Sequence, residues 1–158
     1  MKAVWSLGVA AAVVFAAISG MLAPLDPGVL ALQFAATPQA FARVVHAWSA
    51  EQLALYRLHL PLDFVPLACY GAFGYLLAVR ASLFSTWRPA PRAALRWALP
   101  VAAAFDAAEN ALHAWLTAAP RFDMPLPYAA SALCSALKWL LLVGFAITVA
   151  VALVRARD

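Results

Sequence analysis

Ionisable side chains recur at helical spacing inside a very apolar part of this sequence. One helix face is predicted to carry four polar residues: Asp106, Glu109, Asn110 and His113. Their offsets of three, four and seven residues bring them into one sector, because a helix turns by about 100° per residue. Carboxylates beside an imidazole are suited to acid–base chemistry or to handling an ion.

Two further segments carry polar stripes of the same kind. The first stripe holds Ser131, Cys134, Ser135 and Lys138, and the second holds His59, Asp63 and Tyr70. We count residues from the predicted outer end of each helix, at a rise of about 1.5 Å per residue. Lys138 then lies at nearly the same depth as Glu109 and Asp106. By the same arithmetic the depth of His113 is closer to that of Asp63. We therefore predict that Lys138 pairs with Glu109 or Asp106, and that His113 pairs with Asp63.

The predicted charges on these stripes do not balance. Three acids, Asp63, Asp106 and Glu109, face one lysine and one or two histidines. Ionised acids would repel one another in a low-dielectric interior, so we expect one acid to be protonated or a cation to be bound. The predicted catalytic residues are Asp106, Glu109, Lys138, Asp63 and His113. The predicted ligand-binding residues are Asn110, Tyr70, Ser135 and His59. Alternatively, these groups only hold a small bundle together.

The elements that must position these residues are predicted to be membrane helices. The chain has 158 residues, of which 66% are hydrophobic and 11% charged, whereas about 25% charged is typical of soluble domains. A helix that crosses a bilayer needs about 20 mostly apolar residues, and the sequence offers four such stretches: about 3–23, 60–79, 94–118 and 128–154. We expect an all-α, integral membrane four-helix bundle, in one domain over 1–158, with 3–23 retained as a helix rather than removed as a signal peptide.

Basic residues predict the orientation of these spans. Seven fall on one side: Lys2, Arg80, Arg88, Arg92, Arg96, Arg155 and Arg157. Three fall on the other side: Arg43, Arg57 and Arg121. Because short cytoplasmic loops are enriched in Lys and Arg, we expect the inner membrane, with both termini in the cytoplasm. This also accounts for the net charge of +4, and no basic run with interleaved aromatics indicates nucleic-acid binding.

The connection over 24–59 is then the first extracytoplasmic loop. Thr37 before Pro38 is typical of a helix start, and Ser49 with Gln52 resembles a capping box that starts a second helix. We predict two short amphipathic helices in this loop. They form either a lid over the bundle or a plain interfacial connector.

Cofactor and metal motifs do not emerge from the pattern. Cys69 and Cys134 lie in apolar segments without a CxxC, which indicates packing residues and argues against a thiol oxidoreductase. The three histidines form no HxxxH or HExxH spacing. We expect neither a metal nor a cofactor.

Three motifs carry a resemblance. They are LDxxPxxxYG over 62–71, FDxxEN over 105–110 and LKW over 137–139. Together they resemble a group of small four-helix bacterial membrane proteins, from about Thr37 onward, and this implies the same fold without implying an activity. More loosely, the paired carboxylates are similar to those of the EXPERA group, the sterol isomerase and sigma-2 receptor relatives. That analogy implies a hydrophobic ligand in a compact bundle.

Three functions follow as hypotheses. The first is a membrane protein that binds a lipid-like or isoprenoid molecule, or acts on it as an isomerase, cyclase or hydrolase. Asp106 and Glu109 would handle the proton, and Lys138 would keep one of them ionised. The second is a proton- or cation-coupled transporter, and the third is an accessory or structural subunit. The expected partners are membrane lipids and a hydrophobic small molecule, with no nucleic acid.

Overall fold

The computed structural model describes residues 2–84 and 87–155, and every element in this part of the chain is a helix. The described residues include five longer helices: α1 (Lys2–Leu22), α4 (Ala50–Leu62), α5 (Phe64–Arg80), α6 (Pro89–Ala118) and α7 (Leu126–Arg155). Shorter helices are α2 (Val29–Gln33), α3 (Pro38–Ala47) and the 3-10 turn η1 (Ser82–Phe84). The predicted all-α class is confirmed for this part of the chain, and Arg157 of the orientation argument lies outside it.

Three helical segments among the described residues are long and apolar enough to cross a membrane. They are α1, the combined segment Ala50–Arg80, and α7. The predicted span 94–118 falls within α6, which has 30 residues but is less apolar. Apart from Arg92 and Arg96 near its start, its polar residues are Asp106, Glu109, Asn110, His113 and Thr117, and these five are buried. The polarity of the later turns of α6 therefore lies inside the protein.

The helix α4 corrects one prediction. We expected a separate helix within the outer loop, but only Asp63 divides α4 from α5, and its φ and ψ of −66° and −19° are helical. The Asp63 N–H donates to the His59 carbonyl at 2.9 Å, and the Leu67 N–H donates to the Asp63 carbonyl at 3.1 Å. Backbone hydrogen bonds thus continue past Pro61, so α4 extends the second predicted span.

The remaining boundaries follow local sequence signals. The Thr37 hydroxyl accepts a hydrogen bond from the Ala40 N–H at 3.2 Å, which caps α3 as predicted. The capping box of Ser49 and Gln52 is also confirmed at the start of α4. At the other end of the molecule α6 starts at Pro89, five residues before its predicted start, because a proline at the first helical position loses no hydrogen bond. The single-turn helix α2 was not predicted.

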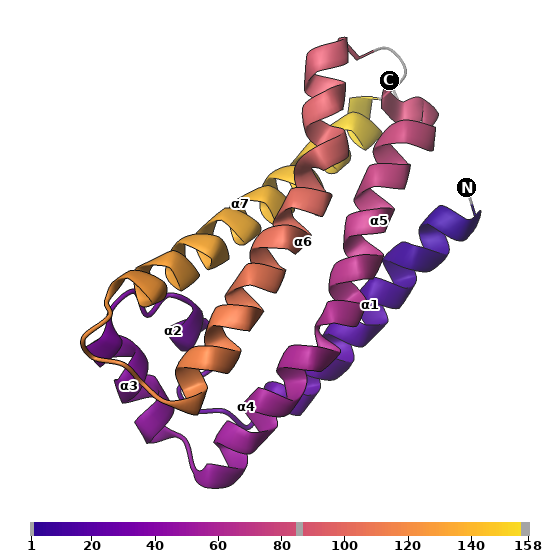
Figure 1. Cartoon of the computed structure of the whole chain (residues 1–158). Coiled ribbons are helices and arrows are strands. Elements are labelled where there is room, and N and C mark those ends of the chain that lie inside the picture. The colour runs from indigo at the N-terminus through magenta and orange to yellow at the C-terminus, as the bar shows by residue number, and fades with distance from the viewer. Residues whose placement is uncertain (1, 85–86, 156–158) are drawn as a thin grey trace.

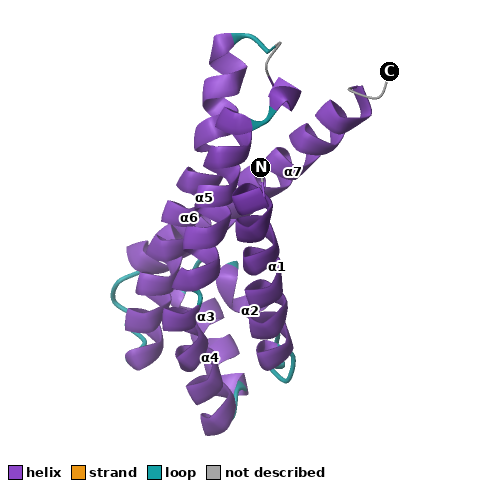
Figure 2. Ribbon diagram, turned by 90° about the vertical axis from the view of Figure 1, so that its right-hand side faces the viewer, coloured by secondary structure: helices purple, strands orange, loops and turns teal. Residues whose placement is uncertain are grey.

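The long helices lie side by side in an order that leaves two of them at the edges. The main contacts join α1 to α5, α5 to α6, and α6 to α7, and Figure 1 shows this order across the molecule. Both termini lie at one end, which we call the terminal end. Helices α2, α3 and α4 lie toward the other end, which we call the loop end (Figure 2).

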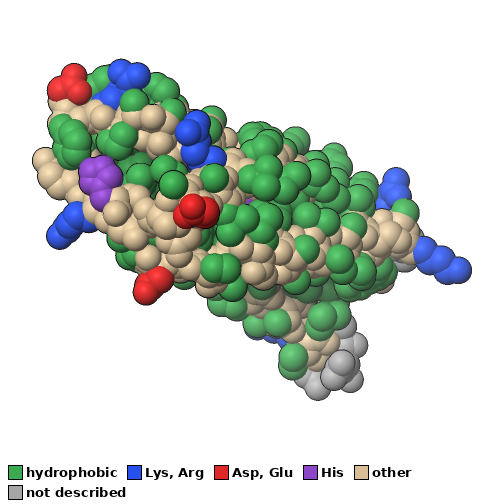
Figure 3. All heavy atoms as spheres, turned by 90° about the horizontal axis from the view of Figure 1, so that it is seen from below, with side chains coloured by type: hydrophobic (Ala, Val, Ile, Leu, Met, Phe, Trp, Pro, Cys, Tyr) green, Lys and Arg blue, Asp and Glu red, His purple; other side chains and the backbone are tan. Residues whose placement is uncertain are grey.

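Each end has its own hydrophobic cluster. At the loop end the cluster joins the short helices to the neighbouring turns of the long ones through Leu32, Phe41, Tyr56, Leu116 and Tyr128, among others. At the terminal end a second cluster includes Val4, Leu77, Leu95, Leu99 and Phe145. Seen from below, hydrophobic side chains also cover much of the surface between charged groups that gather toward the two ends (Figure 3). The polar stripes of α6 and α7 lie between the two clusters.

Candidate functional site

The polar face of α6 meets a polar face of α7 in the protein interior. Asp106, Glu109, Asn110 and His113 are all buried, and His113 has no exposed surface. Opposite them Ser131, Ser135 and Lys138 of α7 are buried as well. The prediction that each set shares one helix face is therefore confirmed, except that Cys134 of the second set is only half-buried.

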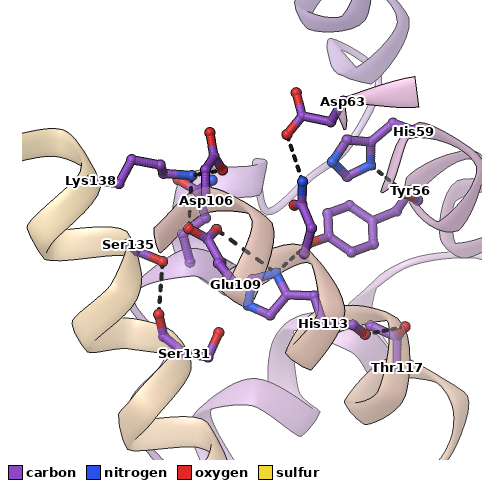
Figure 4. A network of polar contacts seen from close by, with 12 residues as sticks. Tyr56, His59, Asp63, Asp106, Glu109, His113, Thr117, Ser131, Ser135 and Lys138 are labelled. Carbon is purple, nitrogen blue, oxygen red and sulfur yellow. Dashed lines mark hydrogen bonds and ion pairs between the residues drawn. The ribbon is translucent and has the colours of Figure 1, made fainter. Parts of the chain in front are cut away.

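Lys138 forms the centre of this interface. Its ammonium nitrogen Nζ lies 2.7 Å from Asp106 Oδ1 and 2.7 Å from Glu109 Oε2 (Figure 4). The predicted pairing of Lys138 is thus confirmed, with both carboxylates rather than one. A buried charge is costly without partners, so each member of this ion triad depends on the others. With all three groups ionised, the triad carries one net negative charge.

Two hydrogen bonds link α6 to α5 and to Asp63, the residue between α4 and α5. The Tyr70 hydroxyl donates to Asp106 Oδ2 at 3.2 Å. Asn110 Nδ2 donates to Asp63 Oδ2 at 2.8 Å. The carboxylates of Asp106 and Asp63 are thereby each oriented by a neutral donor as well as by helix packing.

The predicted pair of His113 and Asp63 is wrong. His113 Nδ1 instead hydrogen-bonds the Tyr56 hydroxyl at 2.6 Å and lies 4.0 Å from Glu109 Oε1. The reason is the length of the α4–α5 segment, which begins ten residues before the predicted span. Tyr56 therefore reaches the level of His113, while Asp63 meets Asn110.

Tyr56 is the main residue that sequence reasoning missed. It is buried at the contact between α4 and α6, and its backbone carbonyl accepts a hydrogen bond from His59 Nδ1. A signal was present in the sequence, because Tyr56, His59 and Asp63 follow one another at spacings of three and four. Extending the polar stripe by one turn before His59 would have included it.

A cavity of about 670 Å³ opens beside the triad. Its polar lining comes from His59, Asp63, Tyr70, Asp106, Lys138, Gln33 and Ser19. Its apolar lining includes Phe15, Ile18 and Leu22 of α1, Val29 and Leu30 of α2, and Trp139 and Leu142 of α7. The cavity is thus bounded by both edge helices, and its ionisable groups come from the α4–α5 segment, α6 and α7.

The predicted site residues fall into two groups around this cavity. Five of them line it: Asp106, Lys138, Asp63, Tyr70 and His59. The other four, Glu109, His113, Asn110 and Ser135, are buried behind the wall. Ser135 donates to the Ser131 carbonyl one turn earlier in its own helix, at 3.1 Å. This second group supports the wall rather than facing the cavity.

Helices α2 and α3 close the loop end of the site. The Trp139 indole N–H donates to Gln33 Oε1 at 3.2 Å, which ties α2 to α7 beside the cavity. From α3, Phe41 packs against His113 and Tyr128, with ring centroids 5.5 Å and 5.2 Å apart. Of the two predicted roles for this loop, covering the bundle agrees better with these contacts.

The site has groups that are suited to proton transfer. Within residues 2–84 and 87–155, no set of three or more His, Cys, Asp and Glu side chains is placed to hold a metal ion. A carboxylate that both lines an apolar cavity and contacts an ammonium group can hold or release a proton at a fixed position.

The three sequence motifs converge on this one site. Asp63 and Tyr70 belong to the first motif, Asp106 and Glu109 to the second, and Lys138 to the third. Comparisons with protein-family models, with curated proteins and with solved structures find no match.

Proposed function

We propose that this chain is a four-helix membrane protein that binds one lipid-like molecule in its cavity and performs acid–base chemistry on that molecule's polar end. The observation that carries this proposal is the cavity itself. Its volume of about 670 Å³ falls within the range of about 300–1,000 Å³ for small-molecule sites. Its lining is mostly apolar, and a small set of ionisable groups converges on one side of it.

The position of the cavity supports a ligand that comes from the bilayer. The edge helices α1 and α7 both line it, and both are apolar enough to cross a membrane. With these helices in a membrane, the space between them faces the hydrocarbon of the lipids. A hydrophobic molecule can then enter sideways and keep its apolar part against Phe15, Ile18 and Leu142.

The charges on the polar wall favour a particular head group. Lys138 is engaged by two carboxylates. Asp63, whose contact within the described residues is with the neutral Asn110, adds a third acid beside the cavity. A carboxylate or phosphate head would meet more negative than positive charge here. The wall suits a hydroxyl or another hydrogen-bond donor, as on an isoprenoid or acyl alcohol.

Each residue then has a distinct task. Asp106 lines the cavity and touches both Tyr70 and Lys138, so we assign it the proton transfer. Glu109 lies behind Lys138 and acts as a positioning residue that keeps the ammonium group in place. Isomerisation, cyclisation or hydrolysis would each use a proton donor and acceptor of this kind.

Lipid analysis of the purified protein tests the proposal. We expect native mass spectrometry of the wild type to detect one hydrophobic molecule per chain after mild detergent extraction. The Asp106→Asn variant keeps the shape of the side chain and should retain at least tenfold less of it. Asp123→Asn, an exposed site in the α6–α7 connection, is the matched control and should retain as much as the wild type. An empty wild-type protein, or equal retention by both variants, would contradict the proposal.

The membrane topology has its own test. The proposal places α6 across the membrane as the fourth span, with both termini in the cytoplasm of a bacterial cell. Reporter fusions at residues 2 and 155 should then give cytoplasmic signals, while a fusion in the connection at 122–124 should give a periplasmic signal. A cytoplasmic signal from the latter fusion would remove α6 as a span.

A further inference from the structure

The terminal end carries a surplus of positive charge that the cavity does not use. The described basic residues there are Lys2, Arg80, Arg88, Arg92, Arg96 and Arg155. Their helix ends converge, because Val4, Ala78, Leu95 and Ala152 belong to one hydrophobic cluster. Among the described residues, none of these helix ends carries an acid.

The loop end is different, because its charges are mixed. Its arginines, Arg43, Arg57 and Arg121, are accompanied by three acids, Asp26, Glu51 and Asp123. All six of these side chains are exposed. Net positive charge is therefore a property of the terminal end alone and not of the whole surface.

The arginines near the start of α6 lie on successive turns. Arg92 and Arg96 are four residues apart on this helix, and Arg88 is the capping residue just before it. Arg92 reaches across to the end of α5, where Nη2 donates to the Val79 carbonyl at 3.2 Å and Nε to the Ala78 carbonyl at 3.5 Å. This contact brings Arg80, the last residue of α5, beside the arginines of α6.

One of these guanidinium groups has a donor without an acceptor. Arg96 Nε is buried and makes no hydrogen bond within the described part of the chain. Neighbouring guanidinium groups repel each other, and a buried donor without a partner adds a further cost. An anion bound by these guanidinium groups would offset their repulsion.

We propose that Arg80, Arg88 and Arg96 form a binding site for the phosphate of an anionic phospholipid head group. Guanidinium groups bind phosphate oxygens through paired N–H donors, which lysine does not reproduce. Arginines that flank membrane helices also attract the anionic lipids of the adjoining leaflet. The proposal does not depend on the cavity or on its ligand.

A lipid fits this place better than free phosphate, because apolar surface adjoins the arginines. Val79 of α5 and Trp97 of α6 are exposed, at 40% and 53%. Trp97 also packs edge-on against Tyr75, with ring centroids 5.5 Å apart. A phospholipid can place its phosphate on the arginines and its acyl chains along these side chains.

Native mass spectrometry after reconstitution provides the test. The full chain is placed in vesicles of equal parts phosphatidylglycerol and phosphatidylcholine, and the retained lipids are counted. We expect a clear preference for phosphatidylglycerol in the wild type. Changing Arg80, Arg88 and Arg96 together to Gln should reduce it at least tenfold, since each arginine near an anionic surface strengthens binding by about fivefold. Arg92 is left unchanged because it also links α5 to α6.

The control removes the same charge from the other end. Arg43, Arg57 and Arg121 are changed together to Gln, which should alter phosphatidylglycerol retention by less than about twofold. Equal losses in the two triple variants, or no preference in the wild type, would overturn the proposal. Displacement of the lipid by millimolar inorganic phosphate would show a free-anion site instead, and would overturn the choice of a lipid. If the Gln variant fails to fold, wild-type retention should still fall steeply with added salt, and retention that ignores salt would count against the site.

Discussion

The helices α5, α6 and α7 pack in two different ways along their length. Toward the terminal end α5 and α6 approach closely, and a Cβ atom built on Gly74 would lie only 2.5 Å from Leu99 Cβ. Helix α1 approaches α5 closely as well, because a Cβ on Gly8 would lie 2.9 Å from the ring of Phe73. Toward the loop end the same helices are joined by the Lys138 triad and by side-chain hydrogen bonds around a cavity.

With the helices in a membrane, as we propose, this difference follows from how helices associate there. Lipid tails are as apolar as leucine, so helices gain little from burying apolar surface against each other. Close contact at small residues and hydrogen bonds between polar side chains are the remaining sources of stability. Close contact leaves no room for a ligand, whereas long polar side chains such as Lys138 hold helices together across a space. The cavity is therefore found in the half of these helices toward the loop end, which we call the polar half.

Replacing Lys138 should destabilise the polar half and cause the largest loss of stability of any single change. In Lys138→Met, Asp106 and Glu109 stay buried within reach of each other without a cation. Breaking a buried ion pair in this way costs about 3–5 kcal/mol. Thermal unfolding in mild detergent, followed by circular dichroism, should show a correspondingly large loss of stability.

A triple variant separates charge from packing at the same place. Lys138→Met with Asp106→Asn and Glu109→Gln removes all three charges and should recover most of the stability lost in Lys138→Met. If the triple variant is as unstable as the single one, then the shape of the lysine rather than its charge holds this half together. The triple variant should still fail to retain the cavity's ligand.

Filling the contact at Gly74 should destabilise the closely packed half toward the terminal end. In Gly74→Ala the new methyl group on α5 overlaps Leu99, so Leu99 or its helix α6 must shift. Overpacking of this kind costs about 1–3 kcal/mol. Thermal unfolding in mild detergent, followed by circular dichroism, measures this loss of stability. Ligand retention should change less than stability, because the site lies in the polar half.

Gly144 provides the matched control for this change. It also lies within a long helix, but a Cβ on Gly144 would meet nothing within 4 Å. Gly144→Ala should be neutral or stabilising by about 0.5–1 kcal/mol, since alanine favours a helix interior. A loss of stability in Gly144→Ala as large as that in Gly74→Ala would mean that close approach at Gly74 is not the cause.

Losing the Tyr56 hydroxyl should have a smaller effect within the polar half. Tyr56→Phe removes the hydrogen bond to His113 Nδ1 while keeping the ring in place, and we expect a loss of about 1 kcal/mol. Tyr75→Phe is the control, because Tyr75 packs its ring against Trp97 outside this network. Equal stability of the two variants would place Tyr56 among ordinary packing residues.

Residue spacing within one helix carried enough information to predict the polar faces. Asp106, Glu109 and His113 share a buried face because their offsets are a helical property. A contact of Lys138 with one of these acids also followed, since matched depth along two long helices needs only the rise per residue; the structure adds the second acid. The approximate spans were predictable for the same reason.

Contacts that depend on where a helix begins could not be predicted equally well. The predicted second span began at about residue 60, after a separate loop helix, yet Asp63 stays helical and joins the two helices. Because the helix continues through Asp63, Tyr56 contacts His113, where we predicted Asp63. The cavity was also beyond the sequence, because it depends on α1 and α7 lying apart, and no local pattern describes the spacing of two edge helices.

Gly71→Ala should mark the place where the two ways of packing meet, with the smallest effect. Gly71 lies three residues before Gly74 on α5, and a Cβ there would lie 3.4 Å from the Cβ of Ala103 and 3.8 Å from Pro100 Cα. These are ordinary contacts, so α5 and α6 are already farther apart at this level than at Gly74. We expect a change in stability below about 0.5 kcal/mol, because the new contact needs no overpacking. A loss as large as that of Gly74→Ala would show that close packing continues to Tyr70 and Asp106. The polar side chains would then not be what separates the helices, and the cavity would need another explanation.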